Sequence, residues 1–174
     1  HYGQVPRHLQ PMTALLLGLA TVPAWNENPV GVTAQWPQPP QARELAPGAT
    51  FNQRYAYELV QGSAMYRVDM MELKPEALTG RNDIQLLDNG MRGAETLKQF
   101  RPLRVTTTRV ADHMARRWDV QVDKGPLIRH LLVVKRPWMV HALYIGDKQD
   151  ADTKATNEFF GSLKINTPTQ RGSL

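Results

Sequence analysis

Residues 115–146, ARRWDVQVDKGPLIRHLLVVKRPWMVHALYIG, hold a long series of β-branched, aromatic and large aliphatic residues. Two turn sequences, DKG at 123–125 and KRP at 135–137, divide this segment into three short runs. Gly and Pro at such intervals favour strands over a single buried helix. The first run alternates polar and apolar residues, whereas the other two are apolar on both faces, as in strands covered on two sides. The segment therefore predicts three consecutive antiparallel strands within a sheet.

The turn positions also predict which residues lie side by side. If the first turn centres near Lys124, Trp118 lies opposite His130 and Asp119 lies opposite Arg129. The second turn then places His130 near His141. Because side chains alternate between faces, a shift of one residue would move each of them to the other face.

The rest of the chain predicts further strands and two helices. An edge strand is expected at 30–36, with a continuation at 41–45, because the prolines after Trp36 prevent further pairing. A hairpin at 51–60 and 64–73 and a strand at 103–110 complete the sheet. A helix capped by Asn82 or Asp83 is expected to pack through one apolar stripe: Ile84, Leu87, Met91, Ala94 and Leu97.

A last helix is expected to end near Leu163, with acidic residues in its first turn suiting the positive end of the helix dipole: Asp147, Asp150 and Asp152. This order of elements predicts an α+β fold, an antiparallel sheet of about six to seven strands with helices packed on its faces.

Composition sets limits on the chemistry. The 174 residues suit one domain, and the absence of cysteine excludes disulfides, thiolate zinc sites and cysteine nucleophiles. A formal charge of +5 favours anionic partners in general. The sequence contains no phosphate-binding loop and no GxGxxG, HExxH or GxSxG motif, so we predict no cofactor and no catalytic residue.

The first 28 residues differ from the rest. Arg7 and His8 precede an apolar run at 12–24 that is typical of a secretory signal. A buried N-terminal helix or strand is the alternative. We expect a periplasmic or secreted protein, membrane-associated if this segment is retained as an anchor. The predicted organisation is an extension at 1–28, an α+β domain at 29–166 and a flexible tail at 167–174.

An ordered series of short motifs resembles the PsbP-like superfamily over residues 29–166. The strand at 30–37 is similar to the family's FSVxFP opening, and a tyrosine-bearing hairpin at 55–71 and an amphipathic helix near 84–100 follow. RVADHMARR at 109–117 is similar to xxxDGHPGRE, with Asp112, His113 and Met114 replacing the usual Gly-His-Pro turn. The segments 138–146 and 157–165 match the end of the family pattern, the latter its FFxSFxI ending. The resemblance implies an α/β/α sandwich and a binding, assembly or chaperone role without catalysis.

Two sets of residues are candidates for a functional site. His113, His130 and His141 are a candidate imidazole cluster, either a zinc site or a hydrogen-bonded pair without metal. The second set is a basic patch that fits an acidic protein surface or anionic lipid headgroups: Arg104, Arg109, Arg116, Arg117, Arg129, Lys135 and Arg136. The alternative is a solvated face with cross-strand ion pairs such as Asp119–Arg129. We expect no nucleic-acid partner, because the protein is expected to be exported and no glycine-flanked aromatic residues lie among the basic residues.

These observations favour a non-catalytic, exported accessory or assembly protein. It would bind a larger protein, such as a membrane-associated complex, through its extension and its basic face. One alternative is a chaperone-like module that holds apolar segments in a groove lined by Met65, Met70 and Met71. The other is a metal-dependent enzyme that uses the three histidines.

Overall fold

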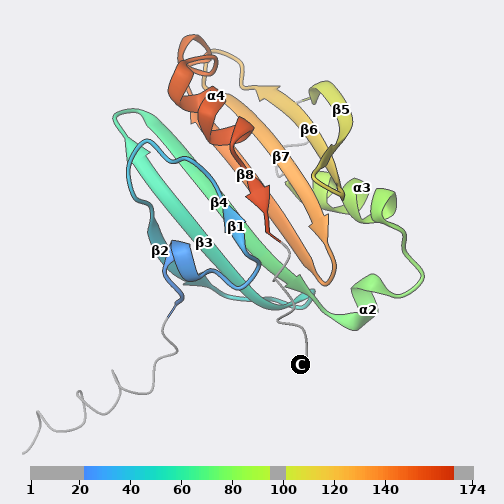
Figure 1. Ribbon diagram of the computed structural model, residues 1–174. Helices are drawn as coiled ribbons and strands as arrows, with labels where there is room; N and C mark the ends of the chain where they lie inside the picture. The colour runs from blue at the N-terminus through green and yellow to red at the C-terminus, as the bar shows by residue number, and fades with distance from the viewer. Residues whose placement is uncertain (1–21, 95–100, 167–174) are drawn as a thin grey trace, which may run out of the picture.

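The computed structural model describes residues 22–94 and 101–166. A seven-stranded antiparallel sheet in the order β2-β3-β4-β8-β7-β6-β5 forms the centre, with a short two-stranded sheet, β1-β9, beside it (Figure 1). The central strands are β2 (Gln41–Leu45), β3 (Phe51–Gln61), β4 (Ala64–Leu73), β5 (Leu103–Val110), β6 (His113–Gln121), β7 (Leu127–Lys135) and β8 (Trp138–Gly146). The predicted α+β class and antiparallel sheet are confirmed.

Strands β6, β7 and β8 are the predicted meander. Trp118 pairs with His130 and Asp119 with Arg129, so the predicted register is confirmed. β8 pairs on its other side with β4, which joins the meander to the β3-β4 hairpin. All but one of the residues from Leu127 to Val134 are buried, because β7 lies between two strands and has both faces covered.

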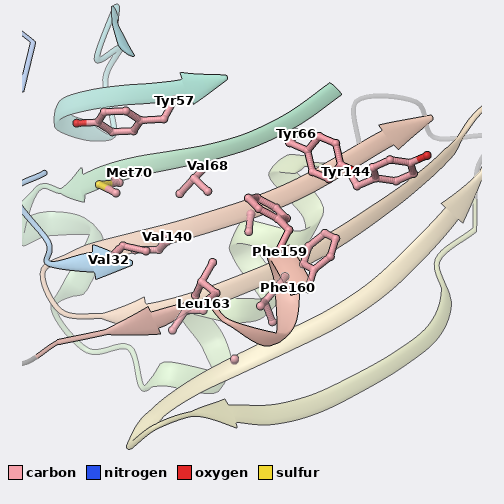
Figure 2. Packing of buried hydrophobic residues seen from close by; sticks show 14 of the residues in the cluster. Val32, Tyr57, Tyr66, Val68, Met70, Val140, Tyr144, Phe159, Phe160 and Leu163 are labelled. Atoms are coloured by element: carbon pink, nitrogen blue, oxygen red, sulfur yellow. The ribbon is translucent and has the colours of Figure 1, made fainter. Parts of the chain in front are cut away.

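One face of the sheet carries the larger core. Helix α4 (Lys154–Gly161) and the pair β1 (Val32–Thr33) and β9 (Lys164–Ile165) lie over this face. Trp25, in the 3-10 helix η2 (Trp25–Glu27), packs edge-on against Trp36 and Tyr57 with ring centroids 5.2 Å apart. The buried side chains of this cluster include those labelled in Figure 2: Val32, Tyr57, Tyr66, Val68, Met70, Val140, Tyr144, Phe159, Phe160 and Leu163.

Helix α3 (Asp83–Ala94) covers part of the opposite face, over β6 and β7. Leu87 is fully buried in a second cluster that includes Trp118 and Leu132. Gly90 allows a close approach, since a Cβ atom at this position would lie 2.7 Å from Leu132 Cδ2. Helix α2 (Pro75–Leu78) precedes α3 in the chain. The fold is therefore a three-layer α/β/α arrangement.

Local hydrogen bonds explain where the helices begin. The Gln85 amide donates to Asn82 Oδ1 and the Asn82 amide donates to Gln85 Oε1, a reciprocal cap that confirms the predicted start of α3. The last helix differs from its prediction. Residues 148–150 form the separate 3-10 helix η3 (Lys148–Asp150), and Thr153 rather than an aspartate caps α4 by accepting from the Thr156 amide.

Two other predictions were wrong. The strand expected at 30–36 is only two residues long and pairs with β9 instead of the main sheet. Gly31 has φ +79°, and Asn28 Oδ1 accepts from the backbone amides of residues 30–32, so the chain turns there. Ile84, expected on the buried stripe of α3, is 38% exposed, and Leu86 is buried in its place. Leu97 lies outside the described residues.

Candidate functional site

A groove of about 870 Å³ lies between the sheet and the helices on the α3 side. Because α3 lies over β6 and β7, the side chains that β3 and β4 present to this face remain partly uncovered. Leu86 and Gly90 of α3 form one wall of the groove. Its floor includes apolar side chains from three neighbouring strands: Met65, Met71, Leu132, Met139 and Leu143.

Two imidazoles also line this groove. His130 Nδ1 lies 2.8 Å from His141 Nε2, and both residues are buried. The Trp118 indole stacks on His130 with centroids 4.5 Å apart and planes at 10°. Burial lowers the pKa of His130 to about 3, with a smaller contribution from His141. Burial and the Arg67 charge lower the pKa of His141 to about 4. Both rings are therefore neutral near pH 7.

The neutral pair has a defined hydrogen-bonding capacity. Each neutral imidazole carries one N–H and one acceptor nitrogen. Since one N–H is used between the rings, the two outer nitrogens together offer one donor and one acceptor. No hydrogen bond joins those outer nitrogens to another residue within 22–94 or 101–166. The pair can therefore contact a neutral polar group.

The third predicted histidine is not part of this pair. His113 begins β6 five residues before Trp118, so alternation along the strand places it on the opposite face of the sheet. Within the described parts of the chain, no three His, Cys, Asp or Glu side chains are grouped as metal ligands would be. The structure brings together two of the three histidines.

An ion-pair chain crosses β3 and β4 at the edge of the groove. Arg67 Nε donates to Asp69 Oδ1 at 2.5 Å, and Arg67 Nη1 donates to Glu58 Oε1 at 2.9 Å. Asp69 pairs across strands with His141. Burial raises the pKa of Asp69 above its ordinary value, and the Arg67 charge only partly opposes this. Neither Arg67 nor Asp69 was singled out from the sequence as part of a site, although their alternation with Met65 and Met71 places all four on one face.

The predicted basic patch is divided among several environments. Arg129 is 4% exposed and bound to Asp119, and Arg116, also buried, donates to Asp88 of α3. Lys135 Nζ donates to the Val30 carbonyl at 2.9 Å. These residues bind within the fold, so they do not form one surface with the others.

The remaining basic residues of the patch are exposed. Arg104 and Arg109 lie on β5, Arg117 lies on β6, and Arg136 lies in the turn before β8, where it donates to Asp83. Arg117 sits 5.9 Å from the Phe160 ring centroid. Arg104, Arg109 and Arg117 form no ion pair with any carboxylate of the described residues. The exposed positive charge therefore gathers around β5 and the adjacent part of β6.

Strand β5 forms one edge of the large sheet. Seven of its eight residues are exposed, and Leu103 and Val105 are 47% and 49% exposed. Consecutive residues of a strand point to opposite faces, so the described residues leave β5 uncovered on both faces as well as along its outer edge. Arg104, with φ +53°, lies within a register irregularity between Leu103 and Thr106.

Comparison with solved structures assigns the fold. The solution structure of CyanoP, the cyanobacterial PsbP of Synechocystis sp. PCC 6803, superposes with a TM-score of 0.54 at 10% identity, covering 86% of this chain and 95% of CyanoP. The chain has the PsbP-like fold. The crystal structure of PA94 from Pseudomonas aeruginosa, a protein of unknown function, gives a TM-score of 0.43 at 15% identity over 64% of this chain and 85% of PA94. No protein-family model and no curated protein matches the sequence.

The resemblance to the PsbP-like superfamily is thus confirmed at the level of the fold, and similarity at such low identity establishes nothing about activity. Within residues 22–94 and 101–166, no helix is both long enough and apolar enough to cross a membrane. Of the methionines expected in a groove, Met65 and Met71 line it, whereas Met70 points into the core on the other face.

Proposed function

We propose that this protein is a non-catalytic accessory or assembly protein that binds an acidic surface of a larger protein through β5 and the arginines beside it. The observation that carries this proposal is the exposure of β5 on both faces and along its edge. Proteins usually shorten, twist or cover an edge strand because its free backbone groups pair readily with another chain. A partner that covers β5 would use those groups.

Charge selects the kind of partner. Arg104 and Arg109 lie within β5, and Arg117 lies on the neighbouring strand. A second copy paired antiparallel about Thr106 and Thr107 would place Arg104 opposite Arg109, and like charges directly opposite are destabilising. An extended segment carrying aspartate or glutamate would instead pair favourably with this edge.

The proposal extends to the place where binding occurs. The signal-like pattern at residues 7–24 supports export to the periplasm or beyond, where the partner would be a protein of a membrane-associated complex. Residues 1–21 lie outside the described part of the chain. In this proposal the extension at 1–28 is a second contact region, anchored to the fold at Trp25.

The test compares two charge reversals. The tagged full chain is incubated with an extract of the native organism at low and at high salt, and captured proteins are compared. Arg104→Glu/Arg109→Glu should lose a partner that both the wild type and Lys148→Glu/Lys164→Glu retain, and high salt should release it. Both pairs of substitutions change the net charge equally. Equal capture by the two variants, or a partner without an acidic segment, would refute this mode of binding.

A further inference from the structure

The groove has the size and lining of a small-molecule site, which is a property separate from partner binding at β5. Its volume of about 870 Å³ falls within the range of typical ligand pockets. Three of its floor residues are methionines from two adjacent strands: Met65, Met71 and Met139. Methionine side chains are flexible and polarizable, so such a floor adapts to apolar ligands of different shapes.

The charged residues around the groove are mainly basic. Its lining has the cations Arg54, Arg67, Lys74 and Arg81 and the carboxylates Asp69 and Glu76. Arg67 is already bound to Asp69 and to Glu58. The neutral imidazole pair adds no charge. Three of the lining cations, Arg54, Lys74 and Arg81, therefore remain against one carboxylate, Glu76, and this excess of positive charge would attract an anion.

Arg54 provides a second, independent observation. Its Nε atom is buried and has no hydrogen-bond partner among the residues that the structure describes. Its guanidinium carbon lies 5.5 Å from the centroid of Phe51, which also lines the groove. Arg54 pairs across strands with Met71, which in turn pairs with Met139. Arg54 Nη1 donates to the Ala46 carbonyl at 3.4 Å, so the unpaired donor is the Nε–H. A guanidinium with one buried N–H left without an acceptor is thus beside the methionines.

We propose that the groove binds an amphiphilic carboxylate, that is, a fatty acid or a similar molecule with one anionic head and an apolar body. The carboxylate accepts from Arg54, with Lys74 and Arg81 supplying further positive charge. The apolar body lies on Met71 and Met139 against the α3 wall.

The test measures binding of a dansyl-labelled fatty acid to the full chain by fluorescence. We expect saturable binding that unlabelled dodecanoate displaces and that dodecanol, which has the same tail without the charge, displaces about tenfold less well or worse. Arg54→Gln should weaken binding about tenfold, whereas Lys148→Gln, which also removes one positive charge but at an exposed site outside the groove, should leave it unchanged. Met71→Gln, at a half-buried position, should also weaken binding, with circular dichroism used to verify folding.

Three results would overturn the proposal. They are an absence of saturable binding, equal displacement by dodecanol and dodecanoate, and equal affinities of Arg54→Gln and Lys148→Gln. Competition by an apolar peptide without any competition by dodecanoate would assign the groove to protein segments instead, and would also contradict it. Partner capture through β5 is measured in a separate experiment. Failure of fatty-acid binding would therefore not refute partner binding at β5, and failure of partner capture would not refute the groove proposal.

Discussion

Replacing Arg129 by methionine is expected to cost this fold about 3–5 kcal/mol of unfolding free energy. Arg129 lies on β7 with a side chain that is 5% exposed. Its Nε and Nη2 donate to the two carboxylate oxygens of Asp119 at 3.0 and 3.2 Å, and Nη1 donates to the Ala151 carbonyl at 2.8 Å. The hydrogen bond to Asp119 is the largest cause of the raised pKa of Arg129. This guanidinium joins two strands to the segment before α4.

The magnitude follows from what the substitution leaves behind. Methionine keeps most of the apolar volume, so the loss is mainly electrostatic. Asp119 is 6% exposed and would remain as a buried carboxylate without its partner. Removing one member of a buried pair costs about 3–5 kcal/mol, and the orphaned Ala151 carbonyl places the estimate toward the upper end. The third contact, with Asp152, contributes little because that carboxylate is 75% exposed.

Urea unfolding followed by fluorescence and circular dichroism measures this loss. A single domain has about 5–15 kcal/mol of stability, so the shift of the midpoint should be large. Arg109→Met, the same change at an exposed position, should alter the free energy by less than about 0.5 kcal/mol. Arg129→Met/Asp119→Leu should recover much of the loss, because no unpaired charge remains. A cost below about 1 kcal/mol for Arg129→Met, or no recovery in the double variant, would refute this account of the pair.

Three further outcomes are expected. The histidine pair has pKa values of about 3 and 4, below the ordinary 6.5, so its contribution to stability is complete above pH 6.5 and is lost as the pH falls toward 4. The free energy of unfolding should fall by up to about 1.4 kcal/mol per pH unit for each histidine in this window, and His130→Gln/His141→Gln should flatten that slope in urea titrations. Asn82→Ala removes the reciprocal cap of α3 and should cost about 1 kcal/mol by the same assay; an unchanged stability would show that the cap contributes nothing. Phe159→Ala should lower the free energy of unfolding by about 3–5 kcal/mol because the ring is fully buried. Ile84→Ala, on the exposed side of α3, should cost far less. Similar losses in the two variants would contradict the assigned core.

The buried imidazoles and ion pairs show which contacts of the candidate site the sequence predicts and which it does not. The contact between His130 and His141 follows from turn positions and strand period, and the structure places His130 Nδ1 2.8 Å from His141 Nε2. Their burial also depends on α3, whose place over β6 and β7 no local pattern specifies. The same patterns did not show that Arg116 would be buried against Asp88, or that Met65 and Met71 would line a groove.

The sequence by itself determined the β6-β7-β8 meander, the β3-β4 hairpin and the register of Trp118 with His130. Local turn chemistry and a side-chain period of two specify these features, so they need no distant contact. Only the tertiary structure decided that β1 pairs with β9, more than a hundred residues away, and that α3 covers β6 and β7 but leaves β3 and β4 open. It also decided which arginines are buried and which remain exposed at β5. Burial depends on what packs above a side chain, and that neighbour comes from elsewhere in the chain.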